Sequence, residues 1–62
     1  MNFLLEYFIE GTTVHKEEYT GSLKSALRYA LNSISHKNSI ANVVEVHKVE
    51  NGKLIWIKEY GV

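Results

Sequence analysis

The alternation of apolar and polar residues predicts a β-hairpin in the last third of the chain. Residues 43–49 (VVEVHKV) and 53–60 (KLIWIKEY) are rich in β-branched and aromatic side chains, which are typical of strands. Asn51-Gly52 lies between these two runs. Asn-Gly is the strongest short-range hairpin signal, because a type I′ turn needs positive φ at both central residues. The pattern therefore predicts two antiparallel strands joined by a two-residue turn.

This turn also predicts which side chains of the hairpin share a face, because a turn of known length fixes the register. Glu50 is expected opposite Lys53, and Val46 opposite Ile57. One face then carries an apolar set, made of Val44, Val46, Ile55 and Ile57. The other face carries the pairs Val43/Tyr60, Glu45/Lys58, His47/Trp56 and Val49/Leu54. We expect the first face to pack on the core.

Residues 2–9 predict another strand, because their odd positions form an apolar set of period two: Phe3, Leu5, Tyr7 and Ile9. The turn residues of 10–13 separate it from a second predicted strand over 14–19. The expected register pairs Ile9 with Val14, and a different loop length would shift it. That register puts Lys16 and Glu18 beside Tyr7 and Leu5. The charged run 16–18 is typical of an edge strand, where charges discourage pairing with another sheet.

Between the hairpins, an apolar stripe at helical spacing predicts one amphipathic helix, formed by Leu23, Ala26, Leu27, Ala30, Leu31 and Ile34. Thr20 or Ser22 can cap its N-terminus. The segment His36-Lys37-Asn38 has the cationic and αL-tolerant residues expected where a helix ends. Leu27 and Leu31 lie at the middle of the stripe, so we expect them among the most buried residues.

The predicted fold is a single ββαββ domain of the α+β class over residues 1–62. The favoured strand order is 2-1-3-4, all antiparallel, and 2-1-4-3 is the alternative. One helix covers only one face of such a sheet. The opposite face is then expected to show a mostly apolar set of side chains: Leu4, Phe8, Val43, His47, Val49, Leu54, Trp56 and Tyr60. That number exceeds the scattered apolar residues of an ordinary surface.

Size and composition favour association with a partner. A chain of 62 residues buries only about 60% of its unfolded surface. The absence of cysteine excludes disulfides and thiolate zinc sites, so oligomerisation is the stabiliser left open. Seven basic and seven acidic residues balance, which disfavours a general nucleic-acid binder. The N-terminal residues lack the features of a signal peptide, and a cytoplasmic location is expected.

No motif predicts catalysis, a cofactor or a metal site, so a non-enzymatic interaction module is the leading hypothesis. Its uncovered sheet face is expected to form a homodimer or to bind another protein. The expected anchors are Leu4, Phe8, Trp56 and Tyr60, because large aromatic groups dominate interface energetics. Leu54 is expected in the same interaction surface. The expected polar part of the patch is Glu45, His47 and Lys58.

A nucleic-acid or small-ligand binder is the alternative hypothesis. In it the same aromatic side chains would stack on bases. Phosphate contacts would come from scattered cations, namely Lys24, Arg28, Lys48, Lys53 and Lys58. The size of the chain alone suggests a small accessory or inhibitor protein of a phage or mobile element.

Overall fold

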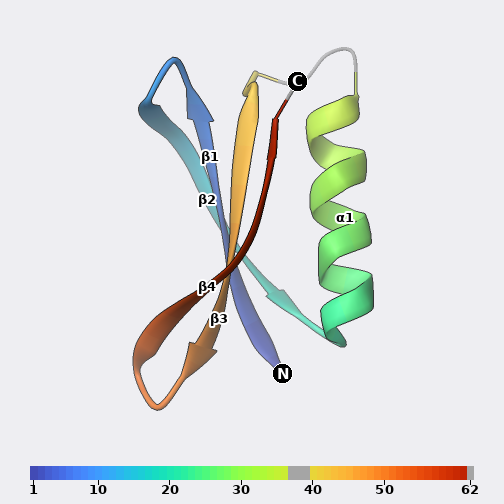
Figure 1. The fold of residues 1–62 in the computed structure, drawn as a ribbon, viewed down its shortest axis with the longest axis vertical. Coiled ribbons are helices and arrows are strands. Elements are labelled where there is room, and N and C mark those ends of the chain that lie inside the picture. Colours follow the sequence, from blue (N-terminus) through green and yellow to red (C-terminus); the bar gives the residue numbers. More distant parts are fainter. Residues whose placement is uncertain (37–39, 62) are drawn as a thin grey trace.

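The computed structural model describes residues 1–36 and 40–61 and confirms the ββαββ order. Its elements are β1 (Asn2–Ile9), β2 (Thr12–Thr20), α1 (Leu23–Ser35), β3 (Val43–Glu50) and β4 (Lys53–Gly61). The strands form one antiparallel sheet in the favoured order β2-β1-β3-β4. α1 lies along one face of this strongly twisted sheet, and no element among the described residues covers the other face (Figure 1).

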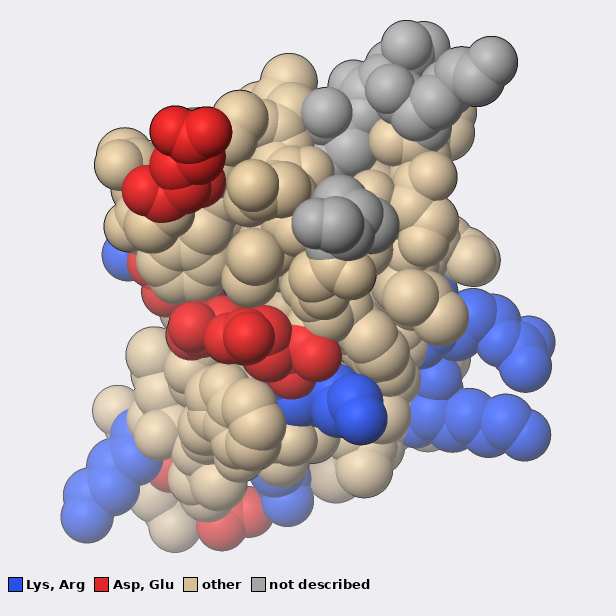
Figure 2. All heavy atoms as spheres, turned by 45° about the horizontal axis from the view of Figure 1, so that its top comes forward, with Lys and Arg blue, Asp and Glu red and all other residues tan. Residues whose placement is uncertain are grey.

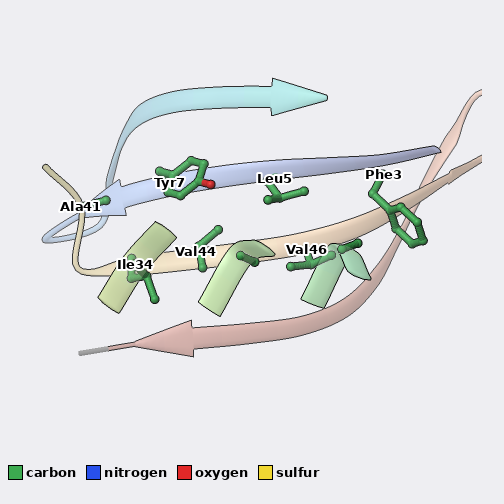
Figure 3. Close-up of a cluster of buried hydrophobic side chains, with 9 residues drawn as sticks. Phe3, Leu5, Tyr7, Ile34, Ala41, Val44 and Val46 are labelled. Atoms are coloured by element: carbon green, nitrogen blue, oxygen red, sulfur yellow. The ribbon is translucent and has the colours of Figure 1, made fainter. Parts of the chain in front are cut away.

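The core forms where the apolar faces of the two central strands meet the helix. Its buried members are Phe3, Leu5, Tyr7, Ala26, Ala30, Ile34, Ala41, Val44 and Val46. The side chains of β1 and β3 gather beside α1 in Figure 3. Both strands are central in the sheet, and the period-two pattern of their residues correctly predicted the buried face. The exception is Ile9 at the end of β1, which was expected in the core and is 44% exposed.

α1 begins at the predicted cap Ser22, whose Oγ accepts a hydrogen bond from the backbone N–H of Ser25 at 3.1 Å. It ends at Ser35, and His36 has extended backbone angles. Lys37 and Asn38, which were expected to end the helix, lie outside the described residues.

The helix is rotated relative to the prediction, so that small side chains face the sheet. Ala26 and Ala30 are fully buried, whereas Leu31 is 44% exposed and Leu27 is only partly buried against the core. The prediction that both leucines are among the most buried residues was therefore wrong. The physical reason is volume: the strands already supply bulky groups such as Phe3, and alanines let the helix pack closely over them.

The β3–β4 hairpin has the predicted turn, with φ of 51° at Asn51 and 76° at Gly52. The pairs next to the turn are confirmed, namely Glu50/Lys53, Val49/Leu54 and His47/Trp56. Beyond them the register shifts between Val46 and His47. Ile57 is the extra residue of a β-bulge, in which two residues of one strand oppose one of the other.

The bulge overturns the face assignments of the last third of β4. The predicted pairs Val46/Ile57, Glu45/Lys58 and Val43/Tyr60 were wrong. The observed pairs are Val46/Lys58, Glu45/Glu59, Val44/Tyr60 and Val43/Gly61. Lys58 and Tyr60 therefore lie on the face that α1 covers, and Tyr60 packs against the core. Glu59 takes a place on the open face.

The β1–β2 hairpin also has a two-residue turn, which the sequence did not predict. Ile9 lies opposite Thr12, with φ of 48° at Glu10 and 82° at Gly11. The expected pairing of Ile9 with Val14 was therefore wrong. A register shift between Tyr7 and Phe8 makes Val14 the extra residue, and Leu5 then lies opposite Glu17.

Candidate interaction surface

The open sheet face is organised in rows that run across β1, β3 and β4. One row consists of Leu4, His47 and Trp56, and the next consists of Glu6, Glu45 and Glu59. Val49 and Leu54 form a pair at one end of the face, and Phe8 lies opposite Val43 toward the other. Six of the predicted interface residues therefore share this face: Leu4, Phe8, Glu45, His47, Leu54 and Trp56. Lys58 and Tyr60 do not.

Exposure divides these six residues into two groups. Leu4, Phe8, Glu45 and His47 are partly buried although no described element covers them. Leu54 and Trp56 are 53% and 57% exposed. The exposed apolar surface of the open face thus lies mainly at the β4 edge. The middle of the face exposes less apolar surface than the sequence predicted.

Four apolar side chains gather at the turn end of the β3–β4 hairpin, and we call them the β4 patch: Val49, Leu54, Ile55 and Trp56. This end of the hairpin curls away from α1 (Figure 1). Ile55 lies opposite Lys48, on the face of β3 that carries Val46, and is still 43% exposed. Sequence reasoning assigned Ile55 to the core, although the run Leu54-Ile55-Trp56 on a terminal strand was a signal of an apolar edge.

A polar row separates the apolar parts of the open face. Glu6, Glu45 and Glu59 lie on adjacent strands, and the row continues to Lys16 on β2. In Figure 2, acidic side chains lie next to one another in the middle of the visible surface, beside a basic one. The described residues contain no group of three or more histidine or acidic side chains placed to hold a metal ion. The row places charged side chains between the apolar side chains at the two ends of the open face.

His47 lies between the acidic row and the β4 patch. Its Nε2 atom is 3.7 Å from Oε1 of Glu45, and only 14% of its side chain is exposed. Its Nδ1 atom is buried without a hydrogen-bond partner among the described residues. His47 is the cross-strand partner of Trp56 on the adjacent strand.

Glu17 connects β2 to both the core and α1. Its two carboxylate oxygens accept hydrogen bonds from the hydroxyls of Tyr7 at 3.0 Å and Tyr29 at 2.9 Å. Burial, with a further contribution from Glu17, raises the pKa of Tyr7 to about 12. The hydrogen bond to Glu17 also raises the pKa of Tyr29. The Tyr29 ring stacks on Tyr19 at 5.0 Å between centroids, so the β2 edge is held against the helix.

A hollow of about 500 Å³ lies beside these tyrosines on the first half of α1. Its lining residues are Tyr19, Ser22, Lys24, Ser25, Arg28, Tyr29 and Asn32. Lys24 and Arg28 have no ion pair with any residue between 1 and 36 or 40 and 61. Lys48 is paired with Glu50 at 2.9 Å. The cations proposed for phosphate contact are therefore dispersed, and only these two line the same hollow.

Comparison of the chain with models of protein families, with curated proteins and with solved structures finds no match. In the part of the chain that the structure describes, no helix is long and apolar enough to cross a membrane.

Proposed function

We propose that this chain is a non-enzymatic protein–protein interaction module that forms a homodimer through the β4 patch. One observation carries the proposal: Leu54, Ile55 and Trp56 are consecutive on an edge strand and are 53%, 43% and 57% exposed. The proposal narrows the predicted interface from the whole open face to one end of it.

The chemistry of an edge strand supports this proposal. An edge presents unpaired backbone N–H and C=O groups, and proteins normally protect it with charges, proline or a cover. Residues 54–56 of β4 have no charge and no proline. Trp56 offers a large aromatic surface at low entropic cost, as anchors of interfaces do. Pairing this edge with a second copy would bury the apolar side chains and satisfy the backbone together.

Sedimentation over a series of concentrations tests the proposal. The wild-type chain is expected to shift from the 7.1 kDa species to a dimer as its concentration rises. Trp56→Ala is expected to weaken association by about 2 kcal/mol or more. Ile40→Ala is the matched control, because Ile40 is also apolar and 67% exposed but lies outside the sheet. A wild-type chain that stays monomeric at high micromolar concentration would contradict self-association.

Binding of an anionic ligand in the hollow on α1 is the second candidate function. The pair Lys24 and Arg28 beside the stacked ring of Tyr29 favours it, because cations and aromatic faces together suit single-stranded nucleic acid. A fluorescent oligonucleotide titrated with the wild-type chain and with Arg28→Ala tests this function. Phosphate contacts would weaken steeply with salt, whereas an apolar dimer interface would not. An affinity that Arg28→Ala leaves unchanged would contradict it.

A further inference from the structure

We infer that two copies of this chain pair through β4 as antiparallel strands, about a two-fold axis that passes through Ile55. The two sheets then form one continuous sheet. This inference rests on the proposed self-association and specifies its register. It follows from the direction of the backbone groups on β4, from the bulge at Ile57 and from the side chains that each register brings together.

The turn determines which residues of β4 have free backbone groups. In a type I′ turn the flanking residues, here Glu50 and Lys53, form a hydrogen-bonded pair. Pairs along an antiparallel ladder then alternate between hydrogen-bonded and non-hydrogen-bonded. The backbone groups of Ile55 consequently point toward β3, and those of Leu54 and Trp56 point away from the sheet. A second strand at this edge must bond to those two residues.

Two-fold pairing of β4 with itself leaves three registers in which these outward groups face each other. Leu54 opposite Leu54 of the second copy would place Trp56 against the turn residue Gly52. Trp56 opposite Trp56 would require a regular ladder through Ile57, where the bulge interrupts it. Leu54 opposite Trp56 uses only the regular stretch before the bulge. That register alone keeps both side chains within the paired segment.

The same register brings complementary side chains together. Leu54 of each copy lies beside Trp56 of the other on the open face, and aromatic–aliphatic cross-strand pairs are favourable. Ile55 lies opposite Ile55 of the second copy on the α1 face. Lys53 and Ile57 lie outside the paired stretch 54–56, which contains no charged residue, so no like charges are directly opposed. The three most exposed side chains of the β4 patch are all covered by one contact.

Disulfide cross-linking tests this register directly, because the chain has no cysteine of its own. Ile55 would lie on the axis as a non-hydrogen-bonded pair, for which the Cα–Cα distance is about 4.5 Å, within the range for a disulfide. Ile55→Cys is therefore expected to give a covalent dimer on mild oxidation. Lys53→Cys is the matched control on the same strand and face. It should cross-link at least about tenfold more slowly, because its two copies are too far apart.

A second cross-linking experiment, in which two cysteine variants are mixed, tests the register without substituting Ile55. Leu54→Cys mixed with Trp56→Cys should give the mixed dimer in preference to either homodimer. Faster cross-linking of Leu54→Cys alone or Trp56→Cys alone would identify another axis and overturn the inferred register. If the wild type dimerises in sedimentation and Ile55→Cys reacts no faster than Lys53→Cys, the register is wrong and the proposed function stands. If the wild type is monomeric, both fail.

Discussion

The two hairpins of this protein share a backbone design and differ in the side chains at their edges. Each has a two-residue turn with positive φ at both positions, at Glu10-Gly11 and at Asn51-Gly52. Each second strand contains a bulge and lies at an edge of the sheet. The two turns lie at opposite ends of the sheet and both curl away from α1 (Figure 1).

The side chains on the two edges have opposite character. β2 presents the charged run Lys16-Glu17-Glu18, and Glu17 is hydrogen-bonded to Tyr29 of α1. β4 presents Leu54-Ile55-Trp56, which are 53%, 43% and 57% exposed. One backbone design thus yields an edge protected by charge and an edge that is apolar. In the proposed homodimer, the capacity to associate would therefore reside in the residues of β4 and not in the fold itself.

The largest expected effect comes from replacing one leucine of each hairpin by alanine. Leu5 on β1 is fully buried and Leu54 on β4 is 53% exposed. Leu5→Ala should lower the free energy of unfolding by about 2–5 kcal/mol, because it leaves a cavity in the core. Leu54→Ala should lower it by less than about 0.5 kcal/mol in the monomer, as expected of a surface position. Urea denaturation of dilute protein measures both, and equal losses would show that β4 belongs to the core.

Most of the fold could be predicted from the sequence, because its main signals are local. Asn51 and Gly52 both tolerate the positive φ that their turn requires. Ser22 caps α1 through a hydrogen bond with a residue only three positions further along the chain. The bulges could not be predicted, since a one-residue insertion depends on how the whole strand twists over the helix. The left-handed conformation of Glu10 was also missed, because glutamate has no intrinsic preference for it.

The residues of the candidate site that precede the bulge of β4 were assigned to the correct face from the sequence. Leu54 and Trp56 are correctly placed, because the turn fixes their register. Tyr60 and Lys58 were assigned to the wrong face, because the bulge at Ile57 reverses the alternation. The partial burial of Leu4 could not be predicted from a pattern of period two, which assigns a face but not the degree of exposure.

The second expected effect concerns the hydrogen bonds that hold the β2 edge. Burial, with a further contribution from Glu17, raises the pKa of Tyr7 to about 12, against about 10 in an unfolded chain. The stabilisation is complete below about pH 10 and is lost as the pH rises through about 12, because the folded state favours the neutral phenol. The full difference corresponds to roughly 2–3 kcal/mol.

Urea denaturation between about pH 9 and pH 12 measures this loss. Tyr7→Phe cannot ionise, so its stability should fall less steeply with pH than that of the wild type, although it starts lower without the hydrogen bond to Glu17. Parallel stability profiles for the two proteins would show that Tyr7 does not determine the alkaline limit.

The third effect exchanges the turn residues of the two hairpins. Both Glu10 and Asn51 occupy the left-handed region, where asparagine is tolerated better than glutamate. Glu10→Asn should raise the free energy of unfolding by about 0.5–1 kcal/mol, and Asn51→Glu should lower it by a similar amount. For a domain of this size a change of about 1 kcal/mol moves the melting temperature by roughly 4–8 °C. Thermal denaturation that shifts in the same direction for both variants would show that the turns are not equivalent.

The smallest expected effect comes from changing the sign of one charge in a cross-strand pair of each hairpin. Glu6 on β1 lies opposite Lys16, whereas Glu45 on β3 lies opposite Glu59, and like charges directly opposite each other destabilise a sheet. Glu59→Lys should therefore raise the free energy of unfolding by about 0.2–1 kcal/mol, and Lys16→Glu should lower it by a similar amount. Both changes should shrink when salt screens the exposed charges. Chemical denaturation at low and high salt measures them, and a gain from Glu59→Lys that persists in high salt would exclude charge as its cause.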